Sequence, residues 1–465
     1  MGLGKTLQAI GIACFYSKEW PILIAGPCSL HNNWKKELST WIDMEWAKSI
    51  IDPNGSTTEY PDNIEPYITI IKSSDHLKKV IEEGDRNKSL VYIISYDLIA
   101  KNNENETPTA EWLRKFTVVI GDESHMLKND VSNRTQSVFP ILKDSKRTIL
   151  VSGTASPSRP IELFTQMKAL FSGIQKKASL SFKKTDFGSR YCDLKISFFT
   201  AADYRGNRLL TELNLLLSRS IMIRRLKRDV LSQLPPKKRF LTYLNLSEED
   251  IGPRRLTFEN FASRKGKKIQ FDDIEVLQKY NLTAVSKRRA VGNYARGMVR
   301  TGEKFIIFAH HKLIMDTLEE EIRSEIEEMA KEGGKKFEYV RIDGETPIEQ
   351  RHEMSQQFRE NENIRVAILS ISVAGVGLNF VPCSTVVFAE LTWNSGTLLQ
   401  AEDRAHRIGQ NSTVNIHYLV ARNTLDEFIW DLLGNKIDVV SETLDGEKEK
   451  EVEHHITKGS RVLSE

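Results

Sequence analysis

The stretch Val118-Val119-Ile120-Gly121-Asp122-Glu123-Ser124-His125 joins an apolar run to two consecutive carboxylates. A short apolar run of this kind is typical of a buried strand in a parallel sheet. Functional side chains gather at the carboxyl edge of such sheets. Asp122 is therefore placed to hold Mg²⁺, and Glu123 to orient and deprotonate an attacking water. A solvated strand end or a helix N-cap is the alternative for the same two residues.

The segment Met1-Gly2-Leu3-Gly4-Lys5-Thr6 predicts the partner of these carboxylates, a phosphate-binding loop. Glycines ahead of a helix offer backbone N–H groups to phosphate, a lysine adds positive charge, and a threonine hydroxyl binds Mg²⁺. An ordinary helix start is the alternative, and the carboxylates make it less favoured. We expect a nucleoside triphosphate at Gly2, Gly4, Lys5 and Thr6, with Mg²⁺ held by Thr6 and Asp122.

Apolar runs of strand length recur along both halves of the 465-residue chain. They cover residues 21–26, 89–95, 116–121 and 147–152, and then 304–309, 339–342, 365–371, 384–390 and 414–420. Helical patterns such as 312–330 and 347–359 fill the gaps, which is the rhythm of a βαβ fold. The predicted class is α/β, with two tandem lobes that each contain a parallel sheet. A basic helical region at 171–302 is expected to connect the lobes and protrude from them.

These patterns divide the chain into a first lobe at 1–235, a second lobe at 236–445 and a charged tail at 446–465. Hydrophobic residues make up 40% of the chain and charged residues 28%, which is typical of a soluble globular protein. A run of about 18 apolar residues, the length of a membrane span, is absent from the sequence. We therefore expect a cytosolic or nuclear protein with no membrane partner.

The net charge of +3 is too small to imply nucleic-acid binding by itself, but basic residues cluster in the middle of the chain. Such clusters attract phosphate backbones through counterion release, and solvated surface faces are an equally weighted alternative. The clusters lie at 224–228, 237–239, 264–268 and 287–289.

The segment from Gln400 to Gln410 carries Arg404 and Arg407, which can reach across a cleft to a transferring phosphate. Together with the two motifs above, it resembles the motor of the SWI/SNF-type, superfamily-two DNA translocases. The resemblance runs from Met1 to about Gly446. Further matching blocks occur in the family's order at 152–154, 308–311, 343–344, 370–379 and 393–394.

Several other short segments resemble one branch of that family, the annealing helicases that remodel stalled replication forks. This branch contains the HepA-related proteins and their zinc-finger, nuclease-bearing relatives, and residues 441–445 are closer to the latter. The matching segments are Asp122–His125, Ser158–Pro160, Arg190–Cys192, Phe308–His311, Phe388–Leu391 and Ile416–Ala421.

The resemblance implies two RecA-like lobes and an ATP-dependent, Mg²⁺-requiring translocase of duplex and branched DNA. It implies annealing-helicase activity in replication fork remodelling and the DNA damage response, in the nucleus, with replication-associated partners bound through regions outside this chain. By matched position, Arg404 and Arg407 are arginine fingers and Gln400 makes an interlobe contact. Gly375 and Gly377 allow the backbone to approach the nucleotide.

DNA is expected along the opposite edge of the same cleft, where hydroxyls and N–H groups position phosphates without reading sequence. For the tryptophans in this set, a place in the hydrophobic core is an equally weighted alternative. The expected DNA-binding residues are Ser29, Trp34, Ser95, Tyr96, His310, Ser370 and Trp393.

The sequence departs from the family pattern because it begins inside the phosphate loop. The first lobe is therefore expected to be truncated at its N-terminus, and the ATPase activity of the chain stays open. One alternative is a DNA-binding fragment that does not hydrolyse ATP, and another is a chromatin remodeller with the same motor. An RNA helicase is a weaker alternative, which stimulation of hydrolysis by RNA would identify.

Overall fold

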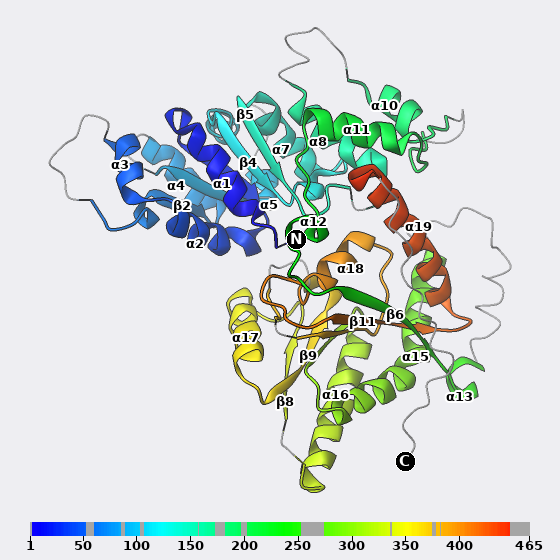
Figure 1. Cartoon of the computed structure of the whole chain (residues 1–465). Helices are drawn as coiled ribbons and strands as arrows, with labels where there is room; N and C mark the ends of the chain where they lie inside the picture. Colours follow the sequence, from blue (N-terminus) through cyan, green and yellow to red (C-terminus); the bar gives the residue numbers. More distant parts are fainter. Residues whose placement is uncertain are drawn as a thin grey trace. The chain divides into compact units, whose positions relative to one another are not determined.

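The computed structural model describes residues 2–52, 60–84, 89–102, 107–156, 158–172, 182–196, 202–252, 274–334, 337–373, 378–381 and 383–446. The chain forms two compact units (Figure 1). The first unit contains the residues up to Arg224 together with 439–448, and the second contains Arg225–Asp438. The predicted lobe boundary after residue 235 lies close to this division. Apart from Gly446, the predicted tail lies outside the described residues.

The first unit contains a parallel sheet of five strands in the order β2-β3-β1-β4-β5. Side chains alternate between the faces of a strand, so each buried strand supplies two hydrophobic cores. In β1, Ile22 and Ile24 pack into one core, and Leu23 and Ala25 pack into the other. The strands are β1 (Ile22–Gly26), β2 (Ile68–Ile71), β3 (Val91–Ser95), β4 (Val118–Asp122) and β5 (Arg147–Val151).

Helices cover both faces of this sheet (Figure 1). Their apolar residues complete the two cores, with Trp34 and Leu38 on one side and Val138 and Leu142 on the other. The helices are α1 (Lys5–Phe15), α2 (His31–Trp41), α3 (Met44–Ile51), α4 (Ser74–Glu83), α5 (Tyr96–Asn102), α6 (Pro108–Arg114), α7 (Asn133–Asp144) and α8 (Phe164–Leu170).

A separate helical cluster follows the sheet in the first unit. It contains α10 (Lys184–Tyr191), α11 (Leu210–Ser220) and the end of α19 (Leu425–Asp445). Phe164, Phe187, Leu213, Val440 and Leu444 form its shared core. The predicted helical protrusion of the first lobe is therefore a packed cluster with its own hydrophobic core.

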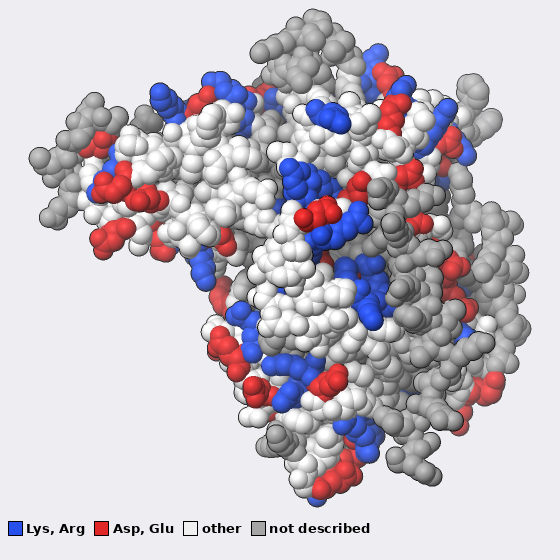
Figure 2. Space-filling model, viewed as in Figure 1, with Lys and Arg blue, Asp and Glu red and all other residues white. Residues whose placement is uncertain are grey.

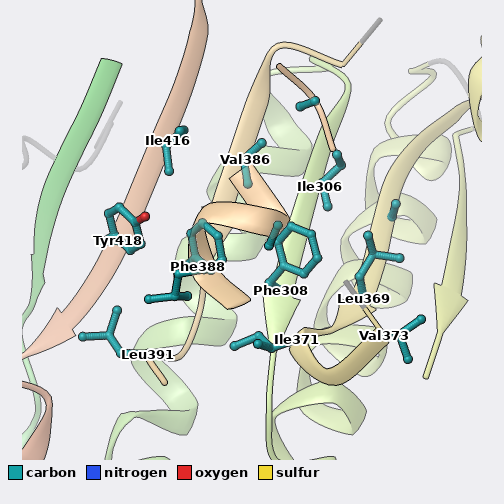
Figure 3. Close-up of a cluster of buried hydrophobic side chains, with 14 of the residues drawn as sticks. Ile306, Phe308, Leu369, Ile371, Val373, Val386, Phe388, Leu391, Ile416 and Tyr418 are labelled. Atoms are coloured by element: carbon teal, nitrogen blue, oxygen red, sulfur yellow. The ribbon is translucent and has the colours of Figure 1, made fainter. Parts of the chain in front are cut away.

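The second unit contains a parallel sheet of six strands in the order β6-β11-β10-β7-β9-β8. Phe308, Phe388 and Tyr418 stand side by side on three neighbouring strands, in register (Figure 3). Their rings stack, with centroids 5.2 Å and 4.8 Å apart. The strands are β6 (Lys237–Leu244), β7 (Phe305–Ala309), β8 (Glu338–Ile342), β9 (Ile364–Ser370), β10 (Thr385–Phe388) and β11 (Val414–Ala421).

The helices of the second unit include two that pack along each other for much of their length, α15 (Ile274–Arg300) and α16 (Lys312–Lys331). Within α15, the buried Lys287 ammonium pairs with Asp426 at 2.7 Å. The predicted basic cluster at 287–289 therefore contains a core ion pair. The remaining helices are α12 (Lys227–Val230), α13 (Glu248–Ile251), α17 (Ile348–Glu360) and α18 (Ser395–Glu402).

The predicted fold class is confirmed, since both units are α/β with parallel sheets. One part of the prediction is wrong. The stretch 171–302 does not only connect the lobes, because β6 and α15 belong to the second unit. Strand β6 was missed because Lys237 and Arg239 break its apolar run. In the part of the chain that the structure describes, no helix is both long enough and apolar enough to span a membrane.

Candidate functional site

Asp122 is the last residue of β4, at the carboxyl edge of the first sheet. The residue is 7% exposed, and its carboxylate accepts two hydrogen bonds. The Trp34 indole Nε1 donates to Oδ2 at 2.8 Å, and the Glu123 backbone N–H donates to Oδ1 at 2.7 Å. Burial, helped by the charge of Glu123, raises the pKa of Asp122 to about 6, while these two hydrogen bonds and the charge of Lys5 oppose the rise. The charges of Lys5 and Glu123 thus both act on the buried Asp122 carboxylate.

Glu123 leaves the strand in a left-handed conformation, with φ 47°. Its Oε2 lies 3.1 Å from His125 Nδ1, and the same nitrogen lies 3.1 Å from Ser152 Oγ. The Ser152 hydroxyl also accepts the Thr154 N–H at 3.2 Å. This chain of contacts connects the carboxylates to the segment 152–154, one of the blocks that match the family's order.

The predicted phosphate loop has a backbone that suits an anion. Gly2 and Gly4 have φ 72° and 66°, which is left-handed backbone that side-chain-bearing residues rarely adopt. Helix α1 begins at Lys5 without a side-chain cap, so the N–H groups of its first turn are available to a ligand. No described atom lies within 4 Å of a Cβ built on Gly4. These groups, with Thr6 and the carboxylates, fit a nucleoside triphosphate and Mg²⁺.

The two predicted arginine fingers lie together in the second unit, just after α18. Arg404 and Arg407 both donate to the carbonyl of Leu378, at 3.3 Å and 3.4 Å. Arg404 is 5% exposed, and Arg407 is partly buried, which lowers its pKa. Gln400 is buried on α18. The predicted contacts at Gly375 and Gly377 lie outside the described residues.

A buried ionic cluster holds the base of this arginine segment. Glu402 is fully buried, and it pairs with Lys237 at 2.6 Å and Arg239 at 2.7 Å, both from β6. Burial alone would raise the pKa of Glu402, but the charges of Arg239 and Lys237 lower it to about 2. Lys227 bridges the Asp403 carboxylate and the His406 carbonyl, at 3.0 Å and 2.6 Å. In the sequence, the only sign of these ion pairs is the acidic pair Glu402-Asp403 directly before Arg404.

This cluster corrects the interpretation of two basic clusters as free DNA-binding surface. Lys227, Lys237 and Arg239 are engaged in ion pairs inside the second unit. Arg224 pairs with Asp445 in the first unit. On the face shown in Figure 2, basic and acidic side chains are interspersed. The cluster at 264–268 lies outside the described residues.

Replacing Glu402 with glutamine is expected to destabilise the second unit by about 3 kcal/mol, because it leaves buried cations without their counter-charge. Hydrogen–deuterium exchange of peptides from β6 and β11 should become faster by a factor on the order of 100. Glu345→Gln, which breaks an exposed pair with Lys312, is the control and should change nothing measurable. Equal exchange in the two variants would contradict a structural role for Glu402.

The pH dependence of the same ion pairs has a definite sign. The pKa of Glu402 is lowered on folding, so its stabilisation is complete above the ordinary carboxyl pKa and is lost as the pH falls toward about 2. The wild-type protein should therefore lose protection in β6 and β11 over this acidic range. Glu402→Gln should show a smaller acid-dependent loss.

The structure separates the predicted DNA-binding residues into buried and exposed groups. Trp34 and Tyr96 are each 1% exposed, and Ser370 is buried with its hydroxyl bonded to Ser372 at 2.7 Å. The prediction that these three side chains contact DNA directly is therefore corrected. Trp34 instead lies in the hydrophobic core, which was the alternative for this residue. The Tyr96 hydroxyl donates to the Asp122 backbone carbonyl at 2.7 Å, so it holds the end of β4 and does not contact the carboxylate. Ser29, Ser95, His310 and Trp393 retain exposed surface.

His310 and Trp393 belong to an aromatic cluster in the second unit. The rings of both lie against Tyr280, with centroids 5.4 Å and 5.0 Å away. The buried Glu390 carboxylate accepts the backbone N–H groups of His310 and His311 at 2.7 Å and 2.8 Å. It also lies 2.6 Å from His311 Nδ1. A buried carboxylate thus holds the backbone on which the exposed His310 ring is displayed.

Comparison with known proteins matches two domain families in succession along the chain. Residues 1–283 match the SNF2-related domain, and residues 286–409 match the helicase conserved C-terminal domain. A solved structure, the C-terminal part of the Fun30 ATPase domain, is similar to 46% of the chain, with 19% identity and a TM-score of 0.31, and 99% of that chain is covered.

Two groups of curated relatives are similar over nearly the whole chain. The SWI/SNF-related matrix-associated actin-dependent regulator of chromatin subfamily A-like protein 1 of Xenopus tropicalis is 39% identical over 95% of this chain and 42% of its own length. The DNA annealing helicase and endonuclease ZRANB3 of Bos taurus is 38% identical over 97% of this chain and 39% of its own length. The chain thus spans about two fifths of these relatives. Because the SNF2-related domain model matches more than half of the chain and the helicase C-terminal model follows it, the chain belongs to the SNF2-related family of helicase-like proteins.

Proposed function

We propose that this chain is the motor of an ATP-dependent translocase of duplex and branched DNA, with annealing-helicase activity. Its role is in replication fork remodelling and the DNA damage response in the nucleus. The observation that carries the proposal is the site at the carboxyl edge of the first sheet, where the buried Asp122 carboxylate ends β4 beside Glu123 and feels the charge of Lys5. Relatives of similar sequence are named as an annealing helicase and as a chromatin regulator.

In this proposal, different groups of the first unit bind the phosphates, hold Mg²⁺ and activate the attacking water. The N–H groups after Gly2 and Gly4 and the Lys5 ammonium bind the phosphates of ATP, while Thr6 and Asp122 hold Mg²⁺. Mg²⁺, when bound, neutralises phosphate charge. Glu123 orients and deprotonates the water that attacks.

Arg404 and Arg407 act as arginine fingers that stabilise charge on the transferring phosphoryl group. Their side chains share the carbonyl of Leu378, and the Glu402 ion pairs fix the backbone that carries them. We assign Gln400 to the interlobe contact. Gly375 and Gly377 are assigned to the approach to the nucleotide, by match to the family motifs.

DNA contacts are assigned to the candidates that keep exposed surface. Ser29 lies just after β1 and Ser95 is the last residue of β3, at the carboxyl edge of the first sheet. His310 and Trp393 lie in the aromatic cluster of the second unit. Hydroxyl, ring and backbone groups of this kind contact phosphate and sugar without a base code. Binding should therefore weaken steeply with salt and depend little on sequence.

The test is ATP hydrolysis by the protein with and without forked DNA, beside the Lys5→Ala variant. Turnover that DNA stimulates and that disappears in the variant supports the motor, and re-annealing of a melted plasmid bubble then tests its direction. A folded protein that binds DNA without turnover would instead identify the non-hydrolysing alternative.

A chromatin remodeller is the second candidate, because one group of relatives carries the name of a chromatin regulator. Nucleosome sliding assayed beside fork regression separates the two. Sliding without fork regression would replace the proposed function.

A further inference from the structure

We propose that Trp34 is a positioning residue of the nucleotide site, whose indole N–H holds the Asp122 carboxylate in the orientation that receives Mg²⁺. This inference rests on the proposed function, since it assumes that Asp122 is a metal-binding residue. It also gives Trp34 a role different from the DNA contact that its sequence context suggests.

The contact joins parts of the first unit that are far apart in the sequence. Trp34 lies on α2, which follows β1 after a short turn, and Asp122 ends the neighbouring strand β4. The hydrogen bond from Nε1 to Oδ2 measures 2.8 Å and is buried. This length is typical of a charge-assisted bond to a carboxylate. Trp34 packs in the same core as Ile24 and Ile120, so its ring has little freedom to move.

The hydrogen bonds of Asp122 leave room for a metal ion. An ionised carboxylate offers about four lone-pair sites on two oxygens. The Glu123 N–H occupies one site on Oδ1, and the Trp34 indole occupies one on Oδ2. One site therefore remains on each oxygen, and two donors from different directions define where these sites point. Without the indole donor, only the Glu123 backbone N–H restrains the carboxylate, which can then rotate more freely about its Cβ–Cγ bond.

The indole is also suited to a buried carboxylate because it donates and cannot accept. Asp122 stands next to Glu123, and two neighbouring carboxylates repel each other when both are ionised. A neutral donor steadies the anion without adding a positive charge that would compete with Mg²⁺. Outer contacts of this type typically change metal affinity by about 10- to 100-fold when they are removed.

The experiment compares Mg²⁺ dependence among matched variants. Binding of a fluorescent ADP analogue is titrated with Mg²⁺ in the wild type, Trp34→Phe, Tyr96→Phe and Trp41→Phe. Tyr96→Phe removes the buried hydrogen bond to the Asp122 carbonyl and leaves the carboxylate contacts in place. Trp41→Phe removes an indole from the same helix. Trp41 is 54% exposed, and its indole N–H donates to Glu37. Thermal unfolding of each variant is recorded in parallel.

The expected result is an increase of about 10-fold or more in the Mg²⁺ concentration at half-saturation for Trp34→Phe. Tyr96→Phe should shift this concentration much less, although it also loses a buried bond, and Trp41→Phe should match the wild type. A folded Trp34→Phe with wild-type Mg²⁺ dependence would overturn the inference. Equal shifts in Trp34→Phe and Tyr96→Phe would also overturn it, since they would show a general loss of packing.

Two further measurements separate a failure of the positioning role from a failure to fold or a failure of the proposed function. If Trp34→Phe does not fold, 3-benzothienylalanine at position 34 preserves the shape of the indole and removes only its N–H donor, and the same shift is expected. If the wild type itself shows no Mg²⁺-dependent nucleotide binding, the proposed function fails. Mg²⁺-dependent binding in the wild type that is unchanged without the donor means that only the positioning role fails.

Discussion

Replacing Arg407 with alanine is expected to lower the turnover number of DNA-stimulated ATP hydrolysis by about 10³-fold or more, with DNA affinity within about twofold of wild type. An arginine finger stabilises charge that appears on the transferring phosphate, so its loss acts on the chemical step. Arg407 is a cleaner target than Arg404, because Arg404 is 5% exposed and its removal would also leave a cavity. Single-turnover hydrolysis and fluorescence anisotropy with forked DNA measure the two quantities.

The control for this variant is Arg323→Ala, which removes an exposed arginine from α16 in the same unit. It should retain wild-type turnover. Arg407→Lys should recover only part of the lost activity, because a lysine keeps the charge without the planar fork. Full activity in Arg407→Ala would exclude the arginine-finger role for this residue.

Glu123→Gln should lower turnover by about 10²- to 10⁴-fold while nucleotide still binds, because the amide cannot accept the proton of the attacking water. The substitution preserves the size of the side chain and the backbone at φ 47°, so the fold should be unaffected. It also removes a charge that raises the pKa of Asp122, so Asp122 should ionise more readily in the variant. Turnover and binding of a fluorescent ADP analogue measure the two effects separately.

Glu111→Gln, an exposed change on α6 of the same unit, is the matched control and should leave both measurements unchanged. Loss of nucleotide binding in Glu123→Gln would indicate that Glu123 holds the metal ion. Unchanged turnover would contradict its assignment as the base.

The sequence was sufficient to predict most of both sheets. Strands such as β1, β4, β7 and β9 are buried on both faces, so each appears as an apolar run. The same argument failed for β6, at the edge of the second sheet, where Lys237 and Arg239 occupy alternate positions. It also failed for β2, a four-residue strand at the edge of the first sheet. In β6 the basic residues interrupt the apolar run, and β2 offers only four residues, one of them a threonine, so neither strand stands out as an apolar run.

The site was predictable to the extent that its residues stand in short local motifs. Gly2 to Thr6, Asp122 and Glu123, and Arg404 to Arg407 were all identified from sequence, and their roles in catalysis stay predictions. Trp34 shows the limit, because an indole suits both a DNA surface and a core. Its partner Asp122 stands 88 residues away along the chain.

The sequence by itself therefore determined the fold class, the family and the segments to which we assign nucleotide chemistry, because each depends on neighbours within a few residues. Only the tertiary structure decided which polar groups support those segments. It pairs Trp34 with Asp122, and Lys237 and Arg239 with Glu402. Hydrogen bonds and ion pairs form between groups that packing brings within about 3 Å, and sequence separation does not encode that distance.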